Sequence, residues 1–506
     1  MSLLYNLLRT IINIPGWLCV LLLGAFTWTI WRYIHPWGSS HLPPGRAPWP
    51  LLGNISLRLN KTNERRLWET SIDLRSYTIS QWLGPMYMIV LHRYEDIKEA
   101  FSKDEFSGRN ESLFKGPLNK YVFSGLFNVE GPRWEEQRKF TITTLKEFGL
   151  GRNRIEQTIQ KEFLELSKEI AKHNGEAFDM KHLLNTCVSN IICSMVFGHR
   201  FNYTDKTFQR MMNLMGENTV NFRRAIIGSM IPGSRFIPGD PFCIKKLKAN
   251  IDEIRRMVIV PELKAHMENY DPNSVNDYID AFIKQMRKPQ SEETETWFTE
   301  DQLQWNIEDL FAAGTETTAT SLRWVFLCML HYPDVQTKVR SEIHRVVGKE
   351  RLPSMHDKVN MPYTEATLVE IQRACTVTSL GPPHCSFHEP TKFQDYILPP
   401  RTNIFANFYA VNNDPDYWKD PEKFRPERFI GEDGKFKKDD HVMTFSVGKR
   451  SCIGESLAKM ELFLFFTCVL QRYKVVQPEG VALPSMDRVP GIAIGPKPYK
   501  LRLIKD

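Results

Sequence analysis

The chain has 506 residues, of which 42% are hydrophobic, 12% aromatic and 25% charged, a composition that excludes a disordered, collagenous or coiled-coil protein. The net charge of +7 is small for this length, so it does not indicate nucleic-acid binding, although it suits an anionic membrane surface or an acidic partner. The nine cysteines are odd in number and form no C-x-x-C pair, which argues against a disulfide framework and a zinc site.

The first predicted element is a membrane-spanning helix. Residues 10–31 contain no Asp, Glu, Lys or Arg, and as a helix this run would be roughly 33 Å long. A cleaved signal peptide and a buried core helix are the alternatives, but the run is long, terminal and without a clear cleavage site. Arg9 alone precedes the run, whereas Arg32 and further cations follow it. We therefore predict an N-terminal membrane anchor over 1–34 and a cytoplasmic location for the rest.

A stiff connector and one large globule are predicted next. Residues 42–53 contain four prolines, so 35–54 is expected to be an extended hinge. No later linker is long enough to separate independent cores, and 55–506 is predicted to be a single, mainly α domain with a smaller β region. Hydrophobic periodicity predicts helices at 94–101, 155–173, 178–197, 301–331 and 455–473, a strand at 86–91, strands and turns within 390–420, and breaks at 225–242 and 286–300.

The most specific motif is Phe445-Ser-Val-Gly-Lys-Arg-Ser-Cys452-Ile-Gly454, which stands directly before an apolar helix. A thiolate in such a loop is stabilised by backbone N–H groups and by the positive end of the helix dipole. Gly448 and Gly454 are expected to let the backbone turn tightly around the sulfur, and Arg450 can offer positive charge. The alternative is an inert buried cysteine, which is our interpretation of the other eight.

This motif resembles the haem-binding loop of the cytochrome P-450 family. The resemblance implies that Cys452 is the axial ligand of a haem b iron, where a thiolate favours O–O cleavage. It also implies that Phe445 shields the sulfur, that Arg450 pairs with a haem propionate, and that Gly454 belongs to the haem site. The chain has Thr444 where the family often has proline, a change that leaves the ligand untouched.

A polar segment interrupts the long helix predicted over 301–331. It reads Ala313-Gly-Thr-Glu316-Thr317-Thr, and by itself it could be a polar helix face or a threonine-bent turn. In the family this is the oxygen-activating helix. The resemblance implies that Glu316 and Thr317 are the catalytic acid–alcohol pair that relays protons, a general-acid task, and that Ala313 and Gly314 leave room for oxygen and substrate above the haem.

Two further motifs resemble parts of the family that support the haem. Glu370 and Arg373 alone would be an ordinary i, i+3 ion pair, but with Arg428 downstream they resemble a structural Glu–Arg–Arg triad. Trp134 and Arg138 are four residues apart, which places them on one helix face. The resemblance implies that this second pair binds a haem propionate through indole N–H and guanidinium groups.

Two additional propionate contacts are implied, at Arg109 and at His384. His384 and His388 could instead form a metal-binding pair, because residues four apart meet on a helix face. The Gly-Pro-Pro sequence just before them argues against the helix that such a pair needs. We therefore assign His384 to the haem site.

The resemblance covers residues 12–503 and points to the microsomal family 2 branch. It implies a mono-oxygenase that inserts one atom of O2 into a lipophilic small molecule (a fatty acid, a steroid or a xenobiotic) at the endoplasmic reticulum membrane. Electrons would come from NADPH through an external reductase carrying FMN and FAD, with cytochrome b5 as a second candidate donor. A haem-thiolate isomerase or dehydratase is one alternative, against which Glu316 and Thr317 argue. A non-catalytic haem sensor is the other.

The resemblance also implies the surroundings of the substrate and of the electron donor. Residues 225–242 lie where the family has a mobile lid. Basic residues near the motifs of the cysteine side are hypothesised to form a docking face for an acidic flavin domain, and the alternative is a solvated charged face: Arg133, Arg138, Lys139, Lys146, Lys449 and Lys459. The walls of the substrate pocket are expected to include Phe127, Asn128, Asp309, Ala313, Leu380 and Ile492.

Overall fold

The computed structural model describes residues 15–34, 41–46, 48, 53–54, 62–83, 86–110, 125–148, 153–230, 237–288, 296–491 and 493–505. Within these ranges the helices are α2 (Gly16–Ile34), α3 (Asn63–Asp73), α4 (Tyr94–Ser102), η1 (Asp104–Phe106), α6 (Gly131–Glu147), α7 (Asn153–Ala171), α8 (Lys181–Val196), α9 (Lys206–Met230), α10 (Ile244–Ile254), η4 (Arg255–Ile259), α11 (Val260–Glu268), α12 (Tyr278–Met286), α13 (Glu300–His331), α14 (Pro333–Val346), η5 (Met355–Asn360), α15 (Pro362–Cys375), α16 (Phe408–Asn413), η6 (Pro426–Phe429) and α17 (Glu455–Arg472). The strands are β1 (Thr78–Leu83), β2 (Met86–Leu91), β3 (His384–Cys385), β4 (Thr391–Phe393), β5 (Tyr396–Leu398), β6 (Asn403–Ala406), β7 (Tyr473–Val476), β8 (Arg488–Val489), β9 (Gly495–Pro496) and β10 (Arg502–Lys505).

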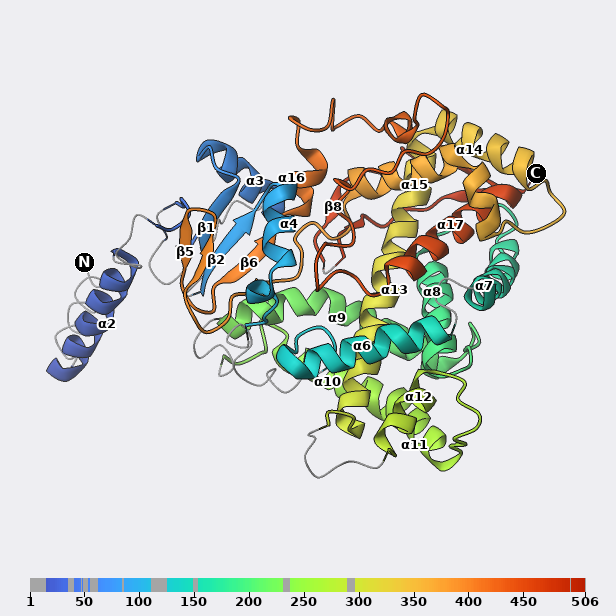
Figure 1. Ribbon diagram of the computed structural model, residues 1–506. Helices are drawn as coiled ribbons and strands as arrows, with labels where there is room; N and C mark the ends of the chain where they lie inside the picture. The colour runs from blue at the N-terminus through green and yellow to red at the C-terminus, as the bar shows by residue number, and fades with distance from the viewer. Residues whose placement is uncertain are drawn as a thin grey trace, which may run out of the picture.

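The long helix α13 runs through the middle of the globule, where α8, α15 and α17 pack against it (Figure 1). It begins where the Thr299 side chain accepts a hydrogen bond from the Gln302 backbone N–H, and it ends before Pro333, which starts α14. Its C-terminal half is buried nearly all round, as expected for a helix at the centre of a core. The polar segment found in the sequence is therefore held at the centre of the molecule.

A small sheet lies at one end of the globule (Figure 1). Its strand order is β1-β2-β6-β3, with β2 parallel to β6 and the other two pairings antiparallel. Buried side chains of β2 and β6 form a second core with Phe101 at the end of α4 and Phe106 in η1. This core fixes the segment that precedes Arg109, and β3 brings His384 to the same edge.

Most predicted elements are confirmed: α4, α7, α8, α13, α17 and β2 lie within three residues of their predicted bounds. The break predicted at 225–242 is wrong for 225–230, where α9 continues, and 231–236 lie outside the described residues. A Cβ atom at Gly228 would lie 2.4 Å from the Cβ atom of Phe242, so the glycine allows that side chain to pack against α9. The segment 390–420 contains the predicted strands but also the short helix α16, because Asn407 caps it.

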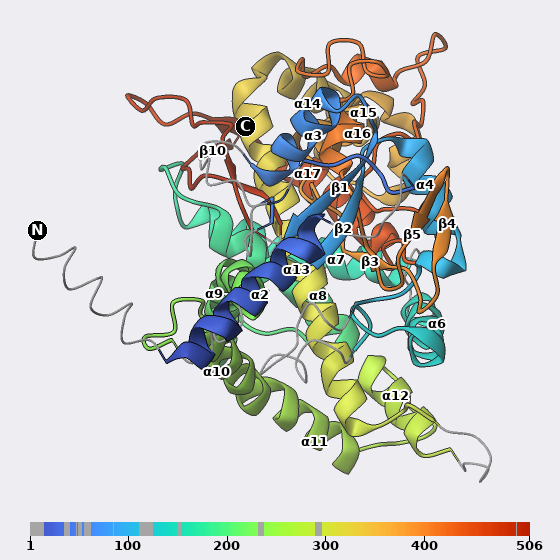
Figure 2. The same cartoon turned by 90° about the vertical axis from the view of Figure 1, so that its left-hand side faces the viewer.

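The N-terminal helix α2 stands apart from the globule in Figure 1 and lies in front of it in the view of Figure 2. Its large apolar side chains are exposed, among them Trp17 at 66%, Val20 at 70% and Phe26 at 58%. No helix in the described part of the chain is both long enough and apolar enough to cross a membrane. The first residues of the span predicted over 10–31 lie outside the described residues. Most of the predicted hinge lies outside them as well.

Candidate active site

The cysteine loop is a closed turn that leads into α17. The Cys452 backbone N–H donates to the Phe445 carbonyl oxygen at 2.9 Å. Gly448 has a φ of +78°, and a Cβ atom there would lie 1.9 Å from the Phe101 carbonyl oxygen, so only glycine fits. Gly454 also lies in a turn, and its backbone N–H approaches the cysteine sulfur, but its φ of −92° does not require glycine, and an added Cβ atom would meet only that sulfur, at 3.9 Å.

The surroundings of Cys452 stabilise a thiolate only in part. The backbone N–H groups of Gly454 and Glu455, together with the Arg138 guanidinium, lower the pKa of the thiol. The Cys452 side chain is solvent-exposed, but the protein atoms around the sulfur desolvate it, and this larger effect raises the pKa above its usual range. A metal cation bound to the sulfur would supply the missing positive charge, which is what haem iron provides.

Two arginines stack around one tryptophan beside this loop. The guanidinium carbon of Arg450 lies 3.6 Å from the Trp134 ring centroid, and that of Arg138 lies 5.8 Å from it. Arg450 donates to the carbonyl oxygens of Ser107 at 3.0 Å and Val129 at 2.7 Å. Arg138 donates to a carbonyl of the cysteine loop at 2.6 Å. The structure thus brings together three residues that the sequence assigned to a propionate site from separate motifs.

A third arginine completes the cluster. Arg109 is 4% exposed, and its Nε atom donates to the Phe127 carbonyl oxygen at 3.0 Å. The nearby Glu130 carboxylate accepts from the Arg109 backbone N–H at 2.6 Å, but its other strong partner is the Arg401 guanidinium at 2.9 Å. Glu130 therefore neutralises Arg401, and no other carboxylate among the residues that the structure describes pairs with the side-chain charge of Arg109. Arg109, Arg138 and Arg450 are called the open arginine cluster below.

The open arginine cluster has more buried positive charge than the protein itself balances. Burial, together with the nearby charges of Arg109 and Arg138, lowers the pKa of Arg450 to about 8, and burial lowers that of Arg109 to about 10. The Nη1 atom of Arg450 is buried and has no hydrogen-bond partner among the described residues. A cluster of this kind fits the two propionates of a haem, which Arg109, Arg138 and Arg450 would hold while Cys452 binds the iron.

His384 lies at the edge of this cluster. Its ring stacks on Phe101 with centroids 3.5 Å apart, and Nδ1 lies 2.9 Å from the Phe106 carbonyl oxygen. Burial, with Arg109 and Arg450 adding to it, holds the pKa well below its usual range. Since the Phe106 carbonyl oxygen can only accept a hydrogen bond, the proton of the neutral His384 ring is on Nδ1. A hydrogen bond from Nε2 to a propionate would therefore require a second proton on the ring, and the negative charge of the propionate favours that proton.

The polar segment of α13 presents two exposed small residues, Ala312 and Ala313, in the middle of a core helix. The Thr317 hydroxyl donates to the Ala313 carbonyl oxygen at 2.6 Å, and the Thr320 hydroxyl donates to Glu316 at 3.3 Å. Burial raises the pKa of Glu316. A carboxyl group with a raised pKa keeps its proton to higher pH, so Glu316 is suited to donate one.

Gly314 does not open space on the same side. A Cβ atom there would lie 2.6 Å from the Cδ1 atom of Ile192, so this glycine lets α8 pack closely against α13. The expectation that Gly314 leaves room for oxygen and substrate is wrong. The exposed neighbours on α13 are Ala312 and Ala313.

Asp309 is tied to the loop before α6. Its Oδ2 atom accepts from the backbone N–H groups of Leu126 at 2.6 Å and Phe127 at 2.9 Å. A Cβ atom at Gly125, whose φ is +82°, would lie 2.3 Å from the same oxygen. Burial raises the pKa of Asp309 to about 6, although the two N–H groups oppose this shift. The sequence predicted Asp309 only as a pocket wall and missed this loop contact, because no local pattern links residues about 180 positions apart.

The remaining candidates for the pocket wall lie on three separate segments. Phe127 is 45% exposed, and Asn128 is half-buried beside it. Leu380 is half-buried and pairs with Asn407 in an isolated β-bridge. Ile492 lies outside the described residues. The loop at 127–128 and Asp309 are therefore in direct contact, and Leu380 lies on a separate segment that pairs with Asn407.

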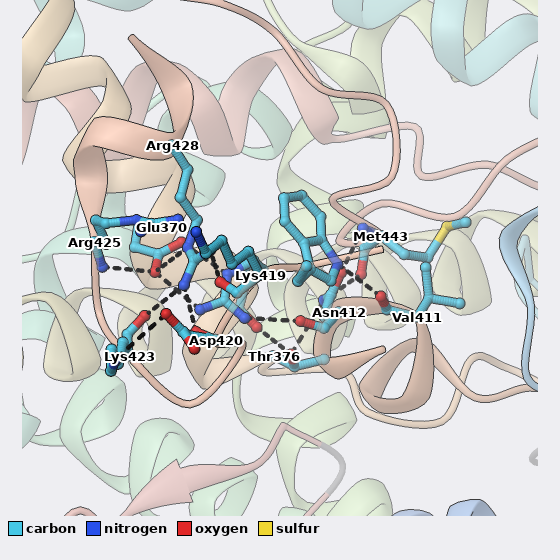
Figure 3. A network of polar contacts seen from close by, with 12 residues as sticks. Glu370, Thr376, Val411, Asn412, Lys419, Asp420, Lys423, Arg425, Arg428 and Met443 are labelled. Atoms are coloured by element: carbon cyan, nitrogen blue, oxygen red, sulfur yellow. Dashed lines mark hydrogen bonds and ion pairs between the residues drawn. The ribbon is translucent and has the colours of Figure 1, made fainter. Parts of the chain in front are cut away.

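A second buried arginine network is centred on Glu370, and its contacts extend to Met443 in the segment that leads into the cysteine loop (Figure 3). Glu370 accepts two bonds from Arg373, at 2.7 and 2.8 Å, and a longer contact from Arg428 at 3.4 Å. Arg373 also donates to the Asn412 carbonyl oxygen at 2.8 Å, and the Asn412 side chain bonds both backbone groups of Met443, two residues before Phe445. We call Glu370, Arg373 and Arg428 the closed arginine network.

Comparisons with known proteins agree with this geometry. The sequence pattern of the family described as cytochrome P450 matches residues 43–503. Cytochrome P450 2C14 of Oryctolagus cuniculus is 37% identical and covers 92% of this chain and 93% of its own length. Cytochrome P450 2E1 of Sus scrofa is 36% identical (96% and 97% covered), and cytochrome P450 2U1 of Homo sapiens is 34% identical (97% and 94% covered). The chain belongs to the cytochrome P450 family.

Family membership defines the class of chemistry. The protein is a haem-thiolate mono-oxygenase that uses haem b, with electrons supplied from NADPH through a reductase. The haem supplies the oxygen-activating chemistry, and the protein supplies orientation, protons and exclusion of water.

Proposed function

We propose that this protein is a membrane-attached mono-oxygenase that hydroxylates a lipophilic small molecule, with Cys452 as the iron ligand and the open arginine cluster as the propionate site. The observation that carries this proposal is the buried surplus of positive charge beside the cysteine loop, where the Nη1 atom of Arg450 has no hydrogen-bond partner in the described part of the chain. A lipophile panel on the reductase-reconstituted protein, with products identified by mass spectrometry, tests the reaction class. Products lacking one atom from 18O2 would contradict it.

The acid–alcohol pair of α13 is proposed to deliver protons. Thr317 lies beside the exposed Ala313, and its hydroxyl can rotate away from the backbone carbonyl to pass a proton onward. Glu316 is the adjacent proton source, because burial raises its pKa. Thr317→Ala is expected to lower product formed per NADPH by about tenfold and to release more hydrogen peroxide.

A matched control exists on another helix. Thr337 in α14 makes the same backward bond, to Pro333 at 2.9 Å, but is exposed and far along the chain from the site. Thr337→Ala is expected to leave coupling unchanged. If both variants lose coupling equally, or if Thr317→Ala loses none, the proton-delivery role is wrong.

The substrate is proposed to lie over the exposed face of α13, with Phe127, Asn128 and Asp309 on one side. Phe127 offers an apolar ring, and the residue is 45% exposed. Asp309 holds the backbone of Phe127 by accepting a hydrogen bond from its N–H group. A fatty acid, a steroid or a xenobiotic would bury its apolar surface there, at roughly 25 cal/mol per Å². Phe127→Ala is expected to raise the spectral dissociation constant of a lipophile without changing the spectrum of the carbon monoxide complex.

Attachment to the endoplasmic reticulum membrane is proposed through residues 1–34, with 35–54 as the hinge and 55–506 as the catalytic domain facing the cytoplasm. The exposed apolar side chains of α2 support this, since an unpartnered apolar helix face favours lipid. Deletion of residues 1–34 is expected to shift the protein from sedimenting membranes to the supernatant. Unchanged sedimentation after washing at high salt would contradict an anchor in that segment.

The electron donor is proposed to dock on the basic side of α6. Lys139 and Lys146 are exposed, and within the described ranges neither has a carboxylate within 4 Å. The other predicted members are less available: Arg133 bonds Gln302, and Arg138 bonds the cysteine loop. The remaining two have acidic partners, as Lys449 pairs with Asp104 and Lys459 with Glu455.

Charge reversal tests this docking face. Lys139→Glu with Lys146→Glu is expected to raise the reductase KM several-fold at low salt and much less at high salt, because exposed charges are screened. The same pair of variants tests cytochrome b5 as a second donor. A reductase KM that is unchanged at both salt concentrations would contradict the docking face.

A further inference from the structure

Helices α11 and α12 lie side by side at the lower end of the globule in both views (Figures 1 and 2). Three side chains that can bind a metal ion meet between them: His266 on α11, Asp277, which caps α12, and Asp280 in the first turn of α12. Their ligand atoms, one nitrogen and two carboxylate oxygens, lie within 4.8 Å of one another. None of the three belongs to the proposed haem site or substrate pocket.

The spacing of His266 and Asp277 suits a shared metal ion. The Nε2 atom of His266 lies 3.0 Å from the Oδ2 atom of Asp277. Two ligand atoms that bind one zinc ion at about 2.0–2.1 Å are roughly 3.0–3.4 Å apart. An ion bound to both atoms would therefore require little movement of either side chain, and Asp280 lies close enough to supply a third ligand.

Each of the three side chains is oriented by a hydrogen bond to the backbone. The Nδ1 atom of His266 lies 2.7 Å from the Glu262 carbonyl oxygen, which only accepts, so Nδ1 carries a proton and Nε2 faces the carboxylates. The Oδ1 atom of Asp277 accepts from the Asp280 N–H at 2.9 Å, and the Oδ2 atom of Asp280 accepts from the Asn276 N–H at 3.0 Å. Hydrogen bonds of this kind hold metal ligands in place in known sites.

The cluster contains more negative than positive charge. Asp280 is 9% exposed and forms no ion pair within the described part of the chain, while the one cation of the cluster, His266, is hydrogen-bonded to Asp277. Burial raises the pKa of Asp280, and the charge of Asp277 adds to this shift. A buried carboxylate without a cation is costly, and a bound divalent ion would remove that cost.

The turn after α8 leaves the Asp277 oxygen uncovered. Gly198 has a φ of +74°, and a Cβ atom there would lie 2.8 Å from the Oδ2 atom of Asp277. The next residue, His199, is turned toward another carboxylate, with its Nε2 atom 3.1 Å from Glu262. The His266 side chain is 13% exposed, so the cluster borders solvent and an ion can reach it.

We propose that His266, Asp277 and Asp280 bind a zinc ion that links α11 to α12. One imidazole nitrogen with two carboxylate oxygens favours zinc over calcium or magnesium, which prefer oxygen ligands alone. Three protein ligands leave a position that water would fill.

The alternative is an ion pair without metal. Burial lowers the pKa of His266, but the hydrogen bond to Asp277 outweighs it, so the pKa is about 9 and a proton competes with zinc for Nε2. Asp280 distinguishes the two arrangements, because it is a ligand of the proposed zinc ion but not a hydrogen-bond partner of His266. The variant Asp280→Asn keeps an acceptor for the Asn276 N–H and leaves the pair of His266 with Asp277 intact.

Equilibrium dialysis of the untagged, haem-loaded full chain against buffered zinc tests the proposal, with zinc and iron measured by mass spectrometry. The parent protein is expected to bind about one zinc ion per haem iron at about 1 µM free zinc. Asp280→Asn and His266→Gln are each expected to weaken zinc binding by at least about tenfold, since even residues that only orient a ligand contribute about 10–100-fold. Zinc should also slow amide hydrogen exchange of the parent in α11 and α12.

His441→Gln is the matched control. His441 also lies beside two carboxylates, but Glu95 is 3.3 Å from its Nε2 atom and Asp439 is 3.5 Å from its Nδ1 atom. The two acids thus lie at opposite ring nitrogens and do not converge on one ion. This variant is expected to bind zinc as tightly as the parent does.

Two results would overturn the proposal. The first is a parent protein that binds no zinc at this concentration, which would leave the ion pair as the role of the cluster. The second is equal zinc binding by the parent, Asp280→Asn and His266→Gln, which would mean an adventitious ion only. If a variant fails to fold, exchange in the parent decides, because slowing by zinc outside α11 and α12 alone would also place the ion elsewhere.

Discussion

The open arginine cluster contacts the cysteine loop and the closed arginine network contacts the segment that leads into it, and the two groups differ in how their charge is balanced. In the closed arginine network the fully buried Glu370 faces Arg373 and Arg428, and the remaining guanidinium bonds go to backbone carbonyls. In the open arginine cluster the guanidiniums of Arg109, Arg138 and Arg450 donate to carbonyl oxygens, and the Glu130 carboxylate beside them is paired with Arg401.

This difference in charge balance distinguishes a network that supports the backbone from a cluster that binds a ligand. A closed network is complete in itself, so its role is to hold the backbone that it bonds, here the Met443 segment that leads into the cysteine loop. An open cluster carries an energetic cost that a bound anion removes, so it marks a binding site. Residue type alone does not distinguish the two, because both consist of arginines on helices and loops.

Breaking the closed network should have the largest effect. Glu370→Gln leaves Arg373 and Arg428 buried without their counter-charge, and we expect a loss of about 3–5 kcal/mol in the free energy of unfolding. Thermal and urea unfolding of the haem-loaded protein measure this loss. Glu427→Gln is the control, because that carboxylate pairs with Lys338 at the surface and should contribute less than about 1 kcal/mol.

The two glycines of the cysteine loop, Gly448 and Gly454, are expected to differ in how well they tolerate a side chain. Gly448→Ala places a Cβ atom 1.9 Å from the Phe101 carbonyl oxygen, so the loop must move, and we expect a loss of at least about 2 kcal/mol with poor haem incorporation. Gly454→Ala should be nearly neutral, because its φ is −92°. Haem content per protein measures both. Equal losses would contradict the loop geometry.

In the open arginine cluster, substitution of Arg450 is expected to weaken haem binding but to stabilise the haem-free protein. Arg450→Met should weaken haem binding, seen as faster haem transfer to apomyoglobin, yet should stabilise the haem-free protein. The pKa of Arg450 is about 8 in the folded chain, well below the ordinary value that it has in the unfolded chain, so the unfolded chain binds more protons above pH 8. The penalty of this charge is therefore fully present below pH 8 and decreases as pH rises above it.

Unfolding of the haem-free parent and of haem-free Arg450→Met across pH 6 to 10 measures this effect. The variant should be the more stable protein at pH 7, with the difference shrinking above pH 8. A variant that is less stable at pH 7 in the haem-free state would mean that the charge of Arg450 is balanced by the protein itself, as in the closed network.

The smallest effect is expected at Asp309, a carboxylate that is balanced by N–H groups instead of by a cation. Asp309→Asn keeps an acceptor for the Leu126 and Phe127 N–H groups without the buried charge, so stability at pH 7 should stay within about 1 kcal/mol of the parent. Asp309→Ala leaves both N–H groups unsatisfied and should cost about 1–3 kcal/mol. Urea unfolding of both variants is the measurement, and the reverse order would contradict this role.

The sequence predicted the main helices and the cysteine loop because these depend on local periodicity and on one contiguous motif. Trp134, Arg138, Arg109, His384 and Arg450 were assigned separately, and the structure places them around one site. What the sequence did not predict depends on distant partners. The helical residues 225–230 owe their close packing to Phe242, and Gly314 is explained by Ile192.

Absorption spectra of the reduced carbon monoxide complexes of the parent protein and of Cys452→Ser are the decisive test of thiolate ligation by Cys452. If Cys452 holds the haem iron as a thiolate, the parent shows the red-shifted Soret band typical of thiolate ligation, and the serine variant loses it. Ligation of the iron by the Cys452 thiolate is contradicted if the variant keeps that band, or if the parent, loaded with haem, never shows it.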